Sequence, residues 1–154
     1  MAEFRLHWQV TNLALTRANT EIVGLVSGLN SVRLQDLVIT VNEAVTNALE
    51  HGAGPAMVTL TADEVGVAVE VTDSGNSLEE HHLQLEPGQR PSRGMGLWII
   101  RQLADQIKVD RPPGQSRLRF RVNRVAPAGV VLGSPSRWYS KPMEHPPEEP
   151  TTSL

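Results

Sequence analysis

The sequence predicts an α+β fold, a two-layer sandwich in which helices cover one face of a largely antiparallel sheet. Apolar and polar residues alternate, as in half-buried strands, near residues 4–10, 57–62, 65–72 and 117–122. Apolar residues recur at helical spacing near residues 13–29, 31–51 and 94–107. Because two strands follow each other with no helix between them, a regular alternation of helices and parallel strands is disfavoured.

The N-terminal elements are a strand and a packing helix. The strand, Phe4–Val10, has its apolar residues on one face: Phe4, Leu6, Trp8 and Val10. We expect the helix that follows, over residues 13–29, to pack through its apolar residues, which are Leu15, Ile22, Leu25, Val26 and Leu29. Gly24 and Gly28 weaken the helical pattern of that stretch.

The second helix has the clearest amphipathic pattern. Asn30-Ser31 can cap its start, since side-chain oxygens accept hydrogen bonds from the N–H groups of the first turn. Gly52 stands where a left-handed C-terminal cap is expected, and Gly54-Pro55 then breaks the chain. The stripe expected to face the core consists of Leu34, Leu37, Val38, Val41, Ala44, Val45, Ala48 and Leu49.

A β-hairpin follows the second helix, with its turn at Asp63-Glu64. One strand presents Val58, Leu60 and Ala62 on one face, and the other presents Val65, Val67, Val69 and Val71. The opposite face of the second strand is small at Gly66 and Ala68, which predicts that something packs closely there.

The C-terminal part begins with a polar stretch at residues 73–77 and a charged stretch at 78–93, which we interpret as a mobile loop. Gly94-Met95-Gly96 then opens a helix that we expect to continue to Ile107. After a turn at residues 111–114, the last strand alternates apolar residues with Arg117, Arg119 and Arg121, which gives it one basic face.

Length and composition indicate one domain over residues 1–125 and a tail over 126–154. Six of the 11 prolines lie in that tail, which we expect to be disordered.

No apolar run approaches the ~20 residues of a membrane helix, and no basic stretch followed by an apolar block suggests a signal peptide. The absence of cysteine excludes a disulfide scaffold and a cysteine nucleophile and fits a cytoplasmic protein. A net charge of −3 disfavours nucleic-acid binding.

Three polar segments carry the candidate chemistry. Glu43 and Asn47, four residues apart, share the helix face opposite the apolar stripe, where a carboxylate can act on a hydroxyl and an amide oxygen can bind Mg²⁺. Asp73 ends a strand two residues before Gly75, where the backbone turns sharply. The segment Gly94-Met95-Gly96-Leu97 opens a helix, whose N–H groups can bind an anion.

Taken singly, each segment also has an ordinary structural explanation. Glu43 and Asn47 suit a solvated helix face, Asp73-Ser74-Gly75 is common turn chemistry, and Gly-x-Gly occurs in many proteins. The lysine and hydroxyl residue of a P-loop are absent, as is the full dinucleotide fingerprint.

Together, in this order and spacing, the segments resemble the GHKL ATPase superfamily, which includes gyrase and the ATP-binding domains of histidine kinases. The string from Glu43 to Gly52 is similar to the asparagine box of bacterial anti-sigma-factor serine/threonine kinases. The two glycine segments are similar to the family's two glycine boxes. The resemblance covers about residues 10–123 and implies a Bergerat-type sandwich.

The resemblance also implies roles for individual residues toward ATP and Mg²⁺. Asp73 would hydrogen-bond the adenine amino group, Asn47 would bind Mg²⁺ and the phosphates, and Glu43 would act as the catalytic base. Ser116 would lie near the adenine, and a lid over residues 78–93 would supply a phosphate-neutralising arginine, Arg93 or Arg90. The remaining nucleotide-binding residues would be Gly75, Gly94, Met95, Gly96 and Leu97.

The sequence departs from the family pattern at Ser77, where many relatives have a second glycine, and in the tail. Two functions remain open from the sequence. The first is an ATP-dependent serine/threonine protein kinase and anti-sigma factor, whose partners would be a sigma factor and an antagonist protein, and which could form a homodimer. The second is a non-catalytic module that senses ATP or ADP and sequesters a regulatory protein. No direct contact with nucleic acid or membrane is expected.

Overall fold

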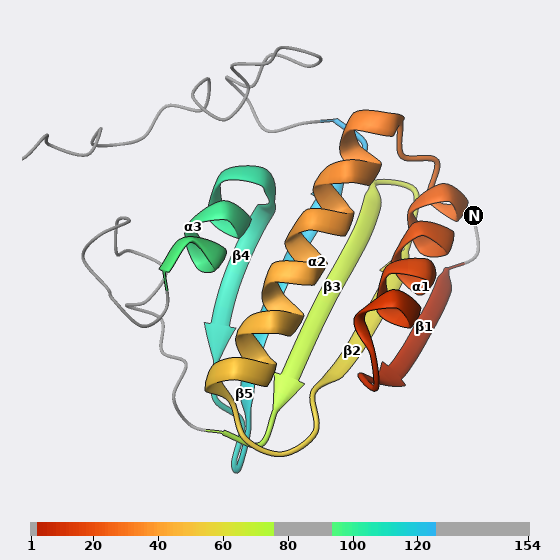
Figure 1. Cartoon of the computed structure of the whole chain (residues 1–154). Helices are drawn as coiled ribbons and strands as arrows, with labels where there is room; N and C mark the ends of the chain where they lie inside the picture. Colours follow the sequence, from red (N-terminus) through yellow and green to blue (C-terminus); the bar gives the residue numbers. More distant parts are fainter. Residues whose placement is uncertain (1–2, 76–93, 126–154) are drawn as a thin grey trace, which may run out of the picture.

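Three helices lie on one face of a five-stranded antiparallel sheet in the computed structural model, which describes residues 3–75 and 94–125 (Figure 1). The sheet order is β1-β2-β3-β5-β4, and every neighbouring pair is antiparallel. The α+β prediction is confirmed. The elements are β1 (Phe4–Gln9), α1 (Leu13–Val26), α2 (Ser31–His51), β2 (Met57–Ala62), β3 (Gly66–Asp73), α3 (Gly94–Leu103), β4 (Asp105–Asp110) and β5 (Ser116–Asn123).

The core lies between the helices and the sheet, and it uses most of the predicted residues. In the three central strands the alternating residues are buried as expected, among them Val58 and Leu60 of β2, Val67 of β3 and Phe120 of β5. From α2 the core receives Leu37, Val41, Ala44 and Val45. The stripe ends before Leu49, which is 51% exposed, and Val65 is exposed in the hairpin turn.

The first helix buries a different face from the one predicted. Its buried residues are Thr16, Thr20, Val23 and Gly24, whereas Leu15, Ile22, Leu25 and Val26 are exposed. The physical reason is the close approach of α2, because a Cβ on Gly24 would come within 2.5 Å of Leu34 Cδ1. The apolar spacing in α1 therefore marks an exposed surface, which we call the α1 apolar face, composed of Leu15, Ile22, Leu25 and Val26.

The third helix is shorter than predicted, and a strand was missed. We expected the helix to reach Ile107, but α3 ends at Leu103 and residues Asp105–Asp110 form β4 at the sheet edge. Arg33 causes the change, since its Nη1 donates to the Leu103 carbonyl (3.1 Å) and its Nη2 contacts Asp105 Oδ2 (2.9 Å). Gln106 has a positive φ of 49°, where the pairing of β4 with β5 is irregular between Asp105 and Lys108.

Arg33 joins the ends of four elements although it has no exposed surface. Besides the contacts at Leu103 and Asp105, its Nη1 donates to Asp36 Oδ2 (2.7 Å) and its Nε to the Asn123 carbonyl (2.7 Å). Asp105 Oδ2 also accepts from the Asn123 N–H (3.0 Å). The start of α2, the end of α3, the start of β4 and the end of β5 are thereby tied to one guanidinium.

Gly66 is buried, and a Cβ there would come within 2.4 Å of the Val122 carbonyl oxygen of β5, so the close packing predicted beside Gly66 is present. Ala68 instead lies on the sheet face away from the helices, which no described helix covers. Ion pairs lie at its rims. A hydrogen bond from Arg121 holds the pKa of Asp63 below its ordinary value. A hydrogen bond from Arg117 lowers the pKa of Asp110, and the same pair raises the pKa of Arg117.

None of the described helices combines the length and the apolarity needed to cross a bilayer. The predicted lid at 78–93 and the predicted tail at 126–154 lie outside the described residues.

We predict that Arg33→Met destabilises the protein by about 3–5 kcal/mol, because it leaves the carboxylates of Asp36 and Asp105 without their buried cation. Urea unfolding at neutral pH measures the loss. Arg17→Met is the control, since the Arg17 side chain is 70% exposed, and it should change stability by less than ~0.5 kcal/mol. Equal stability of the two variants would contradict the structural role of Arg33.

We also predict a decrease in the free energy of unfolding as the pH falls below about 4. The pKa values of Asp63 and Asp110 are lower in the folded chain than in the unfolded chain, so their stabilisation exists above the unfolded pKa and is lost as pH falls through the folded pKa. Arg121→Gln should flatten this decrease by releasing Asp63. Arg17→Gln should not, and identical pH slopes for all three proteins would refute the assignment.

Candidate functional site

The predicted site residues from α2, β3 and β5 gather at one end of the sheet (Figure 1). The C-terminal half of α2 carries Glu43 and Asn47, β3 ends at Asp73, and β5 begins at Ser116. The start of α3 approaches the same part of α2 through Gly96. Segments that are far apart in sequence therefore lie at the same end of the sheet.

Asp73 is the buried carboxylate of this cluster, with 8% of its surface exposed. Its Oδ1 accepts hydrogen bonds from the N–H of Gly75 (2.6 Å) and of Ala53 (3.3 Å). Both hydrogen bonds from the described residues end on Oδ1, so Oδ2 remains available to a donor from a ligand. The main-chain N–H groups fix the orientation of the carboxylate before anything binds.

Two glycines make room for Asp73. A Cβ on Gly52 would lie 2.5 Å from Asp73 Cγ, and a Cβ on Gly75 would lie 2.7 Å from Asp73 Oδ1. The left-handed cap predicted at Gly52 was wrong, because Gly52 has φ −85° and ψ −171°. Gly54, with φ +68°, makes the turn instead. Gly52 is thus needed for close approach rather than for its backbone angles.

Ser116 completes the wall beside Asp73. The two residues are paired in the register of β3 and β5, and Ser116 is 1% exposed. Its Oγ donates to the Gly75 carbonyl (2.8 Å), while the Ser74 N–H donates to the Ala53 carbonyl (2.7 Å). The loop after β3 is therefore held to both β5 and the end of α2.

Glu43 lies against the first turn of α3. A Cβ on Gly96 would come within 2.9 Å of Glu43 Oε2, so a larger residue at that position would displace the carboxylate. A negative charge is favoured at this place, because the first turn of a helix presents unpaired N–H groups and the positive end of its dipole. Asn47 follows one turn later on α2, and both side chains are partly buried.

The remaining predicted residues divide into two groups. Leu97 is fully buried in the hydrophobic core, which leaves its main chain alone for contact with a ligand. The side chain of Met95 and all of Arg90 and Arg93 lie outside the described residues. The sequence analysis missed Gly52 and Ala53 as partners of Asp73, although the string from Glu43 to Gly52 had marked this part of the chain.

The donor set fits a nucleotide with Mg²⁺ better than a metal held by protein alone. Within the described residues, no three His, Cys, Asp or Glu side chains come together. Mg²⁺ requires about six oxygen ligands, and the side-chain oxygen of Asn47 supplies only one of them. Phosphate oxygens at the start of α3 would supply more, and the oriented carboxylate of Asp73 suits a base with an exocyclic amino group.

The chain is similar to known proteins over most of its described residues. The profile of the histidine kinase-like ATPase domain matches residues 8–122. The chain is 30% identical over 103 residues to an anti-sigma F factor of Pasteuria penetrans, and the alignment covers 60% of this chain and 69% of the relative. It is 31% identical over 91 residues to an anti-sigma F factor of Clostridium acetobutylicum, and this alignment covers 53% of this chain and 64% of the relative. The aligned part thus spans about two thirds of each relative's length.

Proposed function

Because the chain belongs to the histidine kinase-like ATPase domain family and is distantly homologous to anti-sigma F factors, we propose that it is an ATP-dependent serine/threonine protein kinase that acts as an anti-sigma factor. The observation that carries the proposal is the placement of Glu43 against the start of α3, at the same end of the sheet as the buried carboxylate of Asp73. A carboxylate for proton transfer and a carboxylate for base recognition are thus held by one rigid framework.

In this proposal Asp73 recognises the adenine through Oδ2, while Gly75 and Ser116 form the adjoining wall. Gly94 and Gly96 let the phosphates approach the first turn of α3, where N–H groups are available. Asn47 contributes an oxygen ligand to Mg²⁺. Arg93, Met95 and the main chain of Leu97 complete the phosphate side, as the resemblance implies.

Glu43 would take the proton from a serine or threonine hydroxyl of the substrate protein. The hydroxyl oxygen would then form a bond to the γ-phosphorus as the bond to the β,γ-bridging oxygen breaks, with ADP as the leaving group. ATP with Mg²⁺ supplies the phosphoryl group and the charge neutralisation when bound. The chain's own part is positioning and proton transfer, which phosphoryl transfer requires most.

The proposed protein partners are a sigma factor and an antagonist that accepts the phosphate. The relatives that support this proposal are anti-sigma F factors. The α1 apolar face supports it further, because a row of exposed leucine, isoleucine and valine on one helix is typical of a surface that binds another protein.

We predict that Asp73→Asn weakens ATP binding by about 1–3 kcal/mol. The asparagine carbonyl can still accept from Gly75 and Ala53, so the fold is retained, but its amide group would face the adenine amino group donor to donor. Isothermal titration with ATP and Mg²⁺ measures the change. Asp110→Asn, on β4, is the matched control and should bind as the original chain does; unchanged affinity in Asp73→Asn would place the adenine elsewhere.

We predict that Glu43→Gln abolishes transfer of labelled phosphate from ATP to an antagonist protein while ATP still binds, because the amide cannot accept the hydroxyl proton. Glu50→Gln is the matched control on the same helix, since the Glu50 side chain is 65% exposed. Transfer by Glu43→Gln at the control rate would exclude Glu43 as the base. Tight ATP binding without any phosphoprotein in the unmodified chain would instead favour the nucleotide-sensing module.

A further inference from the structure

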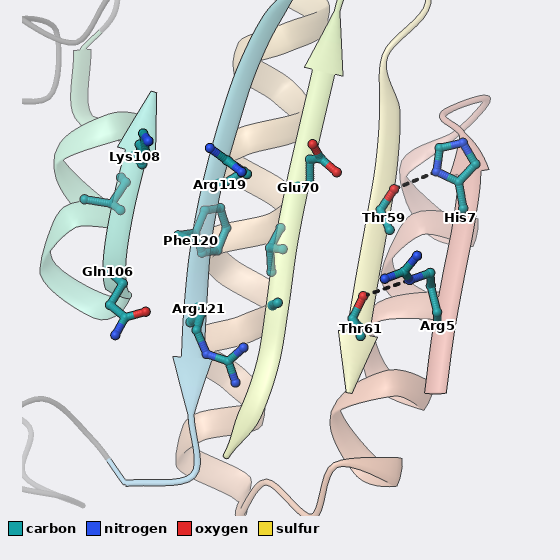
Figure 2. Close-up of a pocket in the computed structure, with 13 residues that line it drawn as sticks. Arg5, His7, Thr59, Thr61, Glu70, Gln106, Lys108, Arg119, Phe120 and Arg121 are labelled. Atoms are coloured by element: carbon teal, nitrogen blue, oxygen red, sulfur yellow. Dashed lines mark hydrogen bonds between the residues drawn. The ribbon is translucent and has the colours of Figure 1, made fainter. Parts of the chain in front are cut away.

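The sheet face away from the helices carries a hollow of about 690 Å³, on the other side of the sheet from α2 with Glu43 and Asn47 (Figure 2). Two rows of facing side chains cross it. One row follows the pairing of Arg5, Thr61, Ala68 and Arg121, and the other follows His7, Thr59, Glu70, Arg119 and Lys108. We call these two rows the open face.

The open face has more cationic groups than its carboxylates can pair. Arg121 pairs with Asp63, and Arg119 shares Asp110 with Arg117. Arg5 donates only to a threonine hydroxyl among the described residues, and Lys108 forms no ion pair within 4.0 Å there, although its charge acts on Asp110. Arg119 Nε is buried without a hydrogen-bond partner. The unpaired charge thus lies at both rims, on β1 and β4.

We propose that the open face binds the acidic segment of this same chain, residues 142–150, which lies outside the described residues. This segment carries Glu144, Glu148 and Glu149 and no lysine or arginine. Its charge is therefore opposite to the excess on the open face, although the whole chain has a net charge of only −3.

The connection is long enough for this contact. β5 ends at Asn123, two residues after Arg121 of the open face, so the chain leaves the sheet beside it. Residues 126–143 follow, and each can span ~3.3 Å when extended. The sheet is only about 19 Å wide, from four strand spacings of ~4.8 Å.

The spacing of the acids also matches the spacing of the cations. Pro142, Pro146, Pro147 and Pro150 favour an extended polyproline conformation, with a rise of ~3.1 Å per residue. Glu144 and Glu149 would then be about 16 Å apart, close to the separation of the β1 and β4 rims. Because proline has no N–H, the segment is suited to crossing the strands by side-chain contacts rather than to joining the sheet edge.

A second copy of the chain is a poorer occupant. A two-fold dimer through this face would set the excess cations of one copy against those of the other. The acidic segment supplies the opposite charge and is present at the high effective concentration of a tethered group.

A spin label tests the proposal, because the chain has no cysteine and Thr151→Cys would provide a unique thiol. In the full-length labelled chain, amide signals of Thr59, Glu70 and Arg119 should lose intensity, while those of the α1 apolar face keep theirs. Raised salt should restore the intensities, as should the triple change Glu144→Gln, Glu148→Gln and Glu149→Gln. Arg17→Gln, on α1, is the control and should restore nothing.

Exchanging the charges of the open face and of the acidic segment gives the most stringent test of the proposal. Arg5→Glu with Lys108→Glu should abolish the intensity loss, and adding Glu144→Lys with Glu149→Lys should bring it back. Equal broadening of the amide signals on both faces of the molecule would overturn the proposal, and so would the absence of any broadening. Broadening that persists in the triple glutamine variant would overturn its charge basis. Broadening seen only between labelled and unlabelled copies in a mixed sample would assign the face to a second copy instead.

Discussion

The guanidinium of Arg33 lies without exposed surface where α2 begins, α3 ends, and β4 and β5 meet. In the proposed nucleotide site, the contact between Glu43 and Gly96 depends on the angle between α2 and α3, since Glu43 is on one helix and Gly96 on the other. Arg33 fixes that angle at the far ends of both helices, and the buried Leu97 and Ile100 fix it along their length. A buried cation is stable there because two carboxylates and two carbonyls surround it.

The two ends of α2 therefore have different tasks. Its first turn anchors the fold through Arg33 and Asp36, and its last turns carry Glu43, Asn47 and the glycine beside Asp73. The functional end keeps polar groups whose hydrogen bonds are incomplete, such as Asp73 Oδ2, while the anchoring end pairs its charges. Because of this division, polar groups with incomplete hydrogen bonding can face a ligand without weakening the contacts that stabilise the fold.

The sequence predicted the sandwich because the sandwich follows from local periodicity. It marked Glu43, Asn47, Asp73 and Gly96 as candidate residues through the resemblance of their motifs, and the structure places Glu43 beside Gly96. It failed where a distant contact overrides a local pattern. The helical periodicity through Ile107 continues past Leu103, but Arg33, 70 residues away, binds the Leu103 carbonyl, and the residues from Asp105 pair with β5. The apolar spacing of α1 predicted a buried face, but the small residues around Gly24 allow α2 to approach on the other side. The sequence analysis expected Gly52 to be needed for a left-handed helix cap. The structure shows that it is needed because Asp73, which is distant in sequence, lies against it.

The central claim is that the ends of α2, β3 and α3 form one nucleotide site. A nuclear magnetic resonance titration of the full-length chain with ADP and Mg²⁺ tests it most directly, because backbone amides report the place of binding without any assumption about catalysis. We expect the largest shifts at Asn47, Ala53, Gly75 and Gly96, with the open face of the sheet unchanged. Shifts centred on Arg119 and Lys108, or no shifts at saturating ADP, would contradict the account.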